Sequence, residues 1–392
     1  MFKEITKDIR YIGVDDTDLD LFESQYIIPE GVSYNSYVII DKKIAIMDTV
    51  DARKTDEWLA NLGDALEGKE PEYVVVLHME PDHAGSLKTL VEKYPNIKIV
   101  GNTKTFMFMN QFFDMDIEDK KVLVSEGDVL ELGTHKLSFI NAPMVHWPEV
   151  MVAFDSESKI LFAADAFGKF GALEGEVVLE DESTWSCEAR RYYFNIVGKY
   201  GMQVQGLLKK AAALDIQMIC PLHGPVLKDN LKFFIDKYDT WSSYKPEDKG
   251  VFIAYASIHG NTAKAAKRME ELLKEAGEEK VAITDLTRDD IAEAVEDAFR
   301  YDRLVLAASS YDGGVFTSME VFLNRLAHKG YKNRTVAIIE NGTWAPSAAR
   351  KMKEVLSTMK DINVIDNVVT IKSSMKDDTV VAMKELAKDI VG

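Results

Sequence analysis

Apolar and polar positions follow a regular order in the C-terminal part of the chain. Continuous apolar runs, which are typical of strands buried on both faces, alternate with segments whose apolar residues have the spacing of a helix. The predicted strands are 251–256, 281–284, 303–308, 335–339 and 364–371. The predicted helices are 261–276, a segment that ends at 298, 318–327, 346–359 and 376–390. This order predicts an α/β domain built on a doubly wound, five-stranded parallel sheet.

Short apolar runs dominate the first 248 residues instead. The predicted strands there are 37–40, 43–47, 73–77, 97–100, 136–140, 151–154, 160–163 and 218–219. The predicted helices are 55–66, 85–93, 103–113 and 200–214. Such a mixture indicates two sheets with helices outside them, an αββα sandwich. A polar segment with Pro246 and Gly250 separates the two patterns, so we expect domains at 1–248 and 249–392.

Length and charge narrow the possible functions. A chain of 392 residues is longer than a single core usually supports, which agrees with two domains. The net charge of −18 makes nucleic acid and anionic membrane unlikely partners. No apolar run approaches the roughly 20 residues that span a bilayer, and the N-terminus lacks a signal-peptide pattern. Two cysteines without a Cys-x-x-Cys pair favour a reduced, cytoplasmic setting.

The densest chemical motif is His78-Met-Glu80-Pro-Asp82-His83, directly after the apolar run 73–77. Two imidazoles and two carboxylates lie within six residues, which is more ligand capacity than one metal ion usually needs. The motif therefore predicts a metal site, and it raises the question of a second metal ion.

Further candidate ligands, His146, Asp165 and His223, also follow predicted strands. Alone, each is more often a turn residue or a satisfied polar group than a metal ligand. Together with the packed motif they indicate one site gathered from several loops. A set of nitrogen and oxygen ligands without thiolate suits iron or manganese at least as well as zinc.

A second constellation opens the C-terminal domain. Ser257-Ile-His259-Gly260-Asn261-Thr262 joins the first predicted strand to a helix. Its hydroxyls, its glycine and the free amides of a helix N-terminus suit a phosphate group, although an ordinary helix cap would look similar. No lysine follows as in a P-loop, so a single terminal phosphate is favoured over a triphosphate with magnesium.

Two more loops follow the third and fourth strands of this sheet. In doubly wound sheets, ligands bind outside the carboxyl ends of the strands. Tyr311 and Trp344 are placed to flank a planar ring, although aromatic residues beside glycine are also common in turns. The remaining candidates for cofactor binding in these loops are Ser309, Ser310, Asp312, Gly313, Gly314, Asn341, Gly342 and Thr343.

The ligand motif resembles that of the metallo-β-lactamase superfamily, in which His-x-His-x-Asp-His joins a later His, Asp and His in a two-metal site. Glu80 stands where the second histidine would be. The resemblance implies that His78, Glu80 and His146 hold one metal ion, and that Asp82, His83 and His223 hold the other. It further implies that Asp165 bridges the two ions.

The C-terminal loops resemble those of flavodoxin and imply FMN, with Ser310-Tyr311 in place of the usual proline–threonine pair. The combination of both domains resembles the flavodiiron proteins. This resemblance implies a non-haem diiron site that reduces O2 to water or nitric oxide to nitrous oxide, with FMN relaying electrons. It also implies rubredoxin or a similar protein as electron donor, and a head-to-tail homodimer or a dimer of dimers.

Aromatic residues near the ligands are candidates for shaping the substrate site. Tyr192 or Tyr193 is placed to offer a hydroxyl to a bound gas molecule, although aromatic residues at such positions are also common in a core. Two other functions remain open from the residues alone. One is a hydrolase that uses two zinc ions, and the other is an electron carrier with an inactive first domain.

Overall fold

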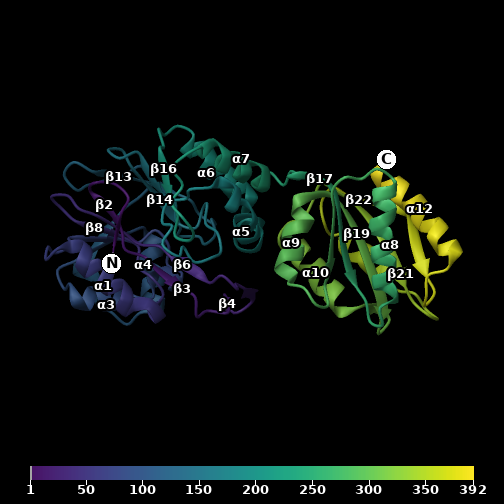
Figure 1. Cartoon of the computed structure of the whole chain (residues 1–392). Coiled ribbons are helices and arrows are strands. Elements are labelled where there is room, and N and C mark those ends of the chain that lie inside the picture. Colours follow the sequence, from purple (N-terminus) through teal and green to yellow (C-terminus); the bar gives the residue numbers. More distant parts are fainter. Residues whose placement is uncertain (1) are drawn as a thin grey trace. The chain divides into compact units, whose positions relative to one another are not determined.

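The computed structural model describes residues 2–392 (Figure 1). The chain divides into two compact units. Unit 1 contains residues up to Tyr193 and Met202–Asp239, and unit 2 contains Phe194–Gly201 and Thr240–Gly392. The short segment Phe194–Gly201 thus packs with the C-terminal unit, because the Phe194 ring stacks on Phe299 at 4.3 Å. No helix among residues 2–392 is long and apolar enough to cross a membrane.

Unit 1 is built on two larger sheets. The first has the strand order β1-β2-β7-β8-β9-β10-β11 and the second has the order β12-β13-β14-β15-β16. The strands of the first sheet are β1 (Lys3–Glu4), β2 (Ile9–Tyr11), β7 (Tyr37–Ile39), β8 (Ala45–Met47), β9 (Tyr73–Val75), β10 (Lys98–Gly101) and β11 (Lys121–Leu123). Those of the second are β12 (Val129–Glu131), β13 (Lys136–Asn141), β14 (Met151–Asp155), β15 (Ile160–Phe162) and β16 (Met218–Cys220).

Two small pairs of strands and several helices complete unit 1. The smaller pairs of antiparallel strands are β3 (Val14–Asp16) with β6 (Val32–Tyr34), and the hairpin β4 (Leu21–Phe22) with β5 (Tyr26–Ile27), which lies between them in the sequence. The α-helices are α1 (Thr55–Leu66), α2 (Pro81–Ala84), α3 (Leu87–Lys93), α4 (Thr103–Phe112), α5 (Ser186–Tyr192), α6 (Gly201–Ala211) and α7 (Leu231–Ser242). Strands β8, β14, β15 and β16 are buried along their whole length, as expected for strands covered on both faces.

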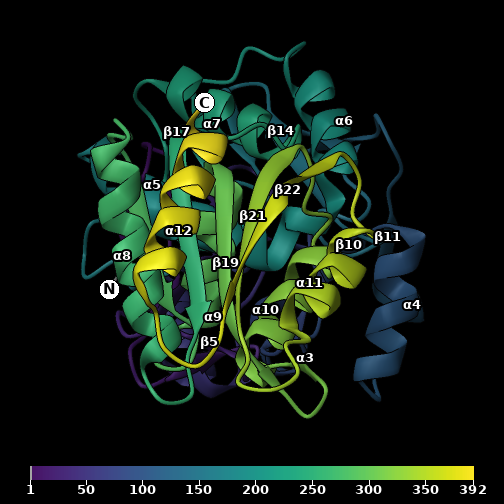
Figure 2. The same cartoon turned by 90° about the vertical axis from the view of Figure 1, so that its right-hand side faces the viewer.

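Unit 2 is a doubly wound sheet with the strand order β18-β17-β19-β21-β22, and each neighbouring pair is parallel. Its strands are β17 (Asp248–Ala256), β18 (Val281–Asp285), β19 (Tyr301–Tyr311), β21 (Arg334–Asn341) and β22 (Ile362–Ile371), and β20 (Gly314–Val315) pairs with β19. Its helices are α8 (Asn261–Glu275), α9 (Ile291–Arg300), α10 (Thr317–His328), α11 (Ala348–Leu356) and α12 (Asp377–Val391). Figure 2 shows α8 and α12 side by side over one face of this sheet.

The predicted fold class is confirmed for both parts of the chain. In unit 2 the alternation of strands and helices follows the predicted order throughout. In unit 1 the pattern missed the strands before Tyr37, β11 and β12, as well as α2, α5 and α7. Several of those strands have only two or three residues, which is too short for a period of two to stand out.

Candidate metal centre and cofactor pocket

The topology of the second sheet brings three predicted ligands to one edge. Strands β13 and β15 both run antiparallel to β14, and β15 runs parallel to β16. The carboxyl ends of β13, β15 and β16 therefore lie at the same edge of the sheet. His146, Asp165 and His223 each follow one of these three strands.

The packed motif reaches the same place from the first sheet. His78 follows β9, and Met151 N at the start of β14 donates to the Leu77 carbonyl, which joins the two sheets here. Glu80 is the N-cap residue of α2, and Pro81 occupies the first helical position, where its missing N–H costs nothing. Asp82 and His83 lie within this single helical turn.

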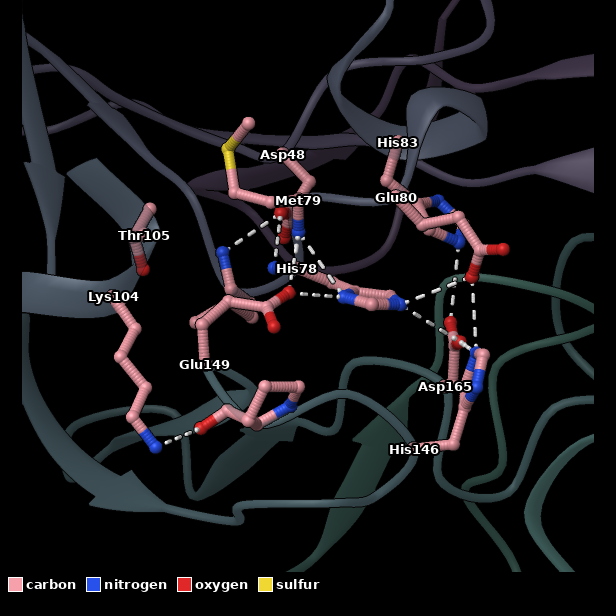
Figure 3. Close-up of polar contacts among 12 residues, drawn as sticks. Asp48, His78, Met79, Glu80, His83, Lys104, Thr105, His146, Glu149 and Asp165 are labelled. Carbon is pink, nitrogen blue, oxygen red and sulfur yellow. Dashed lines mark hydrogen bonds and ion pairs between the residues drawn. The ribbon is translucent and has the colours of Figure 1, made fainter. Parts of the chain in front are cut away.

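Two groups of ligand atoms form around these loops. Figure 3 shows the first group, together with His83 of the second. In the first group, Glu80 Oε2 lies 3.2 Å from His78 Nε2 and 3.0 Å from His146 Nε2. Asp165 Oδ2 lies 3.4 Å from His78 Nε2 and 3.2 Å from His146 Nε2. Four ligand atoms thus converge on one position.

The second group contains Asp82, His83 and His223. Asp82 Oδ2 lies 3.4 Å from His83 Nε2 and 3.2 Å from His223 Nε2. The other carboxylate oxygen of Asp165, Oδ1, lies 3.1 Å from His83 Nε2. Asp165 therefore turns one oxygen to each group, which is the geometry of a bridging carboxylate.

The buried polar atoms of these groups fit a metal centre. Asp165 Oδ1, both oxygens of Asp82, and Nε2 of His83 and of His223 are buried and make no hydrogen bond to any residue in 2–392. Leaving one such atom unpaired costs about 1–3 kcal/mol, so five together need a common partner. Imidazole and carboxylate at this spacing are ligands that iron accepts.

The electrostatics of the groups favour cations. Burial lowers the pKa of His78, but the carboxylates of Asp165, Glu149 and Glu80 outweigh it and raise that pKa well above its ordinary value. Burial likewise opposes charge on His146, yet Asp165 and Glu80 raise its pKa to about 9. A field that holds protons this firmly also attracts metal ions, and metal binding must displace these protons.

Three supporting residues were not predicted from the sequence. Glu149 Oε1 lies 2.7 Å from His78 Nδ1, and the Ser33 carbonyl lies 2.8 Å from His223 Nδ1. Asp48 Oδ1 accepts the N–H groups of Leu77 and His78. Burial raises the pKa of Asp48 to about 7 against these two bonds. No local pattern distinguishes these residues, because each acts through the fold.

The two predicted tyrosines have different surroundings. Tyr192 is fully buried, its ring lies 5.5 Å from that of His223, and its hydroxyl makes no hydrogen bond within residues 2–392. Burial, then Asp165 and Asp82, raise the pKa of Tyr192 well above its ordinary value. The Tyr193 ring instead packs edge-on against Tyr238 at 5.1 Å. Tyr192 therefore lies against a predicted ligand.

A cavity of 480 Å³ lies at the carboxyl ends of the strands in unit 2, a size typical of small-molecule sites. Of the residues predicted to bind a cofactor, those that line it are Ser257, His259, Asn261, Thr262, Ser309, Ser310, Tyr311, Asp312, Gly313, Asn341, Gly342, Thr343 and Trp344. Gly260 and Gly314 do not line it. Gly260 caps α8 with a φ of 83°, a conformation that glycine adopts without strain, and Gly314 belongs to β20.

Hydroxyl and amide side chains that line this cavity are hydrogen-bonded to one another or to the main chain. Thr262 Oγ1 lies 2.9 Å from Ser309 Oγ, and Asn341 Nδ2 donates to the Ser373 carbonyl at 3.0 Å. Trp344 is 90% exposed and Tyr311 is 48% exposed, so both rings are open to a ligand. Ile258, Ala345, Ser347 and Ser373 line the cavity as well and were missed by the sequence analysis. Ser373 follows the last strand of the sheet, but a serine at such a position is ordinary in any loop and gives no specific signal.

Comparisons with known proteins agree with both sites. The profile described as ODP family beta lactamase matches residues 32–224, and a flavodoxin domain profile matches residues 252–369. An uncharacterized protein of Methanocaldococcus jannaschii is 30% identical over 99% of this chain and 98% of its own length. An anaerobic nitric oxide reductase flavorubredoxin of Vibrio vulnificus is 26% identical over 89% of this chain and 71% of its own.

Solved structures share the fold over the full chain. The rubredoxin oxygen:oxidoreductase of Desulfovibrio gigas has a TM-score of 0.93 at 24% identity and covers 100% of this chain and 98% of its own. The flavodiiron protein of Giardia intestinalis has a TM-score of 0.92 at 24% identity, with coverages of 100% and 96%. This chain belongs to the flavodiiron protein family. As a flavodiiron protein it is an oxidoreductase with FMN and a non-haem diiron site.

Proposed function

We propose that this flavodiiron protein reduces O2 to water, nitric oxide to nitrous oxide, or both, with electrons from rubredoxin or a similar small protein. The observation that carries the proposal is the pair of ligand groups that share Asp165, in a chain that also has a cavity suited to FMN. Relatives named for nitric oxide reduction and for oxygen reduction with rubredoxin support both substrates.

The proposed ligand assignment follows the two groups. His78, Glu80 and His146 would hold one iron ion, Asp82, His83 and His223 would hold the other, and Asp165, which turns one oxygen to each group, would serve both. Bound iron and bound FMN supply the electron-transfer steps. The protein residues fix the ligand geometry and exclude water, because all these side chains except Glu80 are buried.

We further propose that Tyr192 acts at the substrate site. Its buried hydroxyl has no other hydrogen-bond partner within residues 2–392, so its proton is available to a ligand at the metal centre. The contact of Tyr193 with Tyr238 gives that residue a packing role instead. Steady-state kinetics of Tyr192→Phe and Tyr193→Phe test this assignment, and the expected loss of turnover is at least about 100-fold for Tyr192→Phe alone.

The assembly and the setting are proposals of the same kind. We propose a head-to-tail homodimer, or a dimer of such dimers, and a cytoplasmic location. We also propose a domain boundary between residues 248 and 249, nine residues after the point at which the chain enters unit 2 for its last segment, Thr240–Gly392. Size measurement in solution and protease cleavage between the domains test these points.

One experiment tests the activity itself. Iron and FMN are measured per chain, and the consumption of nitric oxide without oxygen, and of O2, is then followed with reduced rubredoxin. Consumption of either gas supports the proposal. A sample that is fully loaded with iron and FMN and consumes neither gas contradicts it, and zinc in place of iron together with ester hydrolysis favours a hydrolase.

A further inference from the structure

We infer that Glu149 is a positioning residue of the metal centre, which holds the His78 imidazole in one orientation and makes the two metal positions electronically unequal. The inference rests on the proposed ligand assignment. It concerns a side chain that contacts a ligand and not the metal itself.

The contacts of Glu149 are specific and fully buried. Both Glu149 and His78 are 0% exposed. Glu149 Oε1 lies 2.7 Å from His78 Nδ1 and accepts the Met79 N–H at 2.9 Å (Figure 3). The Glu149 main chain is held in turn, because Asn102 Nδ2 donates to its carbonyl at 2.6 Å. The carboxylate is thus fixed from two sides before any metal binds.

This geometry determines which ring nitrogen of His78 can bind a metal ion. Nε2 faces Glu80 and Asp165 in the first ligand group, so it must be unprotonated when metal is bound. The ring then keeps its proton on Nδ1, where the carboxylate of Glu149 accepts it. A lone pair on Nδ1 would instead face an anionic oxygen at 2.7 Å, which is repulsive.

The second carboxylate oxygen of Glu149 indicates that the negative charge of this side chain interacts with the metal centre. Oε2 is buried and has no hydrogen-bond partner among residues 2–392. An unsatisfied buried carboxylate oxygen is destabilising unless a positive charge lies nearby. Through the imidazole of His78, the bound metal ion supplies that charge.

In the second ligand group, no carboxylate of residues 2–392 accepts a hydrogen bond from Nδ1 of His83 or of His223. His223 Nδ1 lies against the neutral Ser33 carbonyl, and His83 Nδ1 makes no hydrogen bond to a residue in 2–392. A carboxylate on the distal nitrogen makes an imidazole a stronger electron donor to its metal. The iron on His78 is therefore the one whose ferric state is favoured more.

Two substitutions separate orientation from charge. Glu149→Gln keeps an oxygen that accepts from His78 Nδ1 and Met79 N but removes the charge. Glu149→Ala removes both. Binding of Co²⁺ to the apoprotein, ⁵⁷Fe Mössbauer spectra and redox titration of the iron-loaded protein are measured for each. Asp155→Asn is the matched control, because Asp155 Oδ2 lies 2.8 Å from His135 Nδ1 in the same unit, away from the ligands.

The expected result is a loss of about 10–100-fold in Co²⁺ affinity at one position for Glu149→Ala. For Glu149→Gln we expect full iron loading, a higher reduction potential and a change in one Mössbauer doublet. Asp155→Asn should alter none of these readouts. Unchanged metal affinity in Glu149→Ala, or an unchanged potential and spectrum in Glu149→Gln, overturns the inference. Wild-type protein that binds no iron would instead contradict the proposed function.

Discussion

The two candidate sites of this protein differ in charge and in burial. The metal centre in unit 1 gathers buried imidazoles and carboxylates, and Asp165 is only 1% exposed. The pocket in unit 2 is lined by hydroxyls, amides and glycines, and of its two aromatic side chains Trp344 is 90% exposed and Tyr311 about half exposed. Charge that must meet a metal ion is kept from water, where it would be screened, whereas a phosphate is bound by neutral donors at a loop.

This difference predicts that the two cofactors respond to separate sets of residues. A buried, charged site loses its ion when one ligand is removed, because the remaining charges are left unbalanced. An open site with many neutral contacts loses affinity in smaller steps.

Removing the bridging carboxylate should have the largest effect. Asp165→Ala takes one oxygen from each ligand group, so we expect loss of iron from both positions and loss of gas reduction. FMN content should stay at the wild-type level. Metal analysis and flavin absorbance of the same sample check this, and normal iron content in the variant would contradict the bridging role.

Removing hydroxyls from the phosphate loop should spare the iron and weaken FMN. Ser257→Ala with Thr262→Val removes hydroxyls that line the cavity. A hydrogen bond to a charged group contributes about 1.5–3 kcal/mol, so we expect FMN affinity to fall at least about 100-fold. Flavin titration of the apoprotein measures the affinity, and Ser243→Ala, in the segment before β17, serves as a control.

The exposed tryptophan offers a finer test of the same pocket. Trp344→Ala should leave the free energy of unfolding within about 0.5 kcal/mol of wild type, because the side chain is 90% exposed. Loss of ring stacking should weaken FMN binding by about 1 kcal/mol, or roughly fivefold. Denaturant titration and flavin fluorescence measure the two effects, and a large loss of stability would assign Trp344 to the core instead.

The pair of His135 and Asp155 shows how a carboxylate and an imidazole behave away from the ligands. The hydrogen bond to Asp155 raises the pKa of His135. Burial opposes the charge on Asp155, but His135 and Ser158 outweigh it and lower the pKa of Asp155. Asp8 and Asp41 also face this histidine and favour its charged form.

The pH dependence of this pair follows from those directions. A raised pKa on His135 stabilises the fold fully below about pH 6.5, and the effect is lost as pH rises through the folded value. A lowered pKa on Asp155 acts above about pH 4 and is lost as pH falls. We expect Asp155→Asn to lower the free energy of unfolding by about 1 kcal/mol between about pH 4 and pH 6.5. At higher pH, where His135 loses its charge, we expect a smaller loss. A difference from wild type that does not vary with pH would contradict this.

Many residues of the candidate metal centre could be predicted from the sequence because they directly follow strands. The apolar run before His78 and the strands before Asp165 and His223 placed these side chains at strand ends without any knowledge of the fold. The cavity in unit 2 was predicted for the same reason, since parallel strands put their loops at one edge. Ser373 escaped because a serine after a strand is ordinary in any loop.

By itself, the sequence determined the order of strands and helices in unit 2 and the residue types that meet at the metal centre. Hydrophobic periodicity and packed ligands are local properties of the chain. Only the tertiary structure decided that Glu149 faces His78, that Asp165 turns one oxygen to each group, and that Tyr192 lies against His223. Such contacts join residues far apart in sequence, and the packing of the sheets sets them.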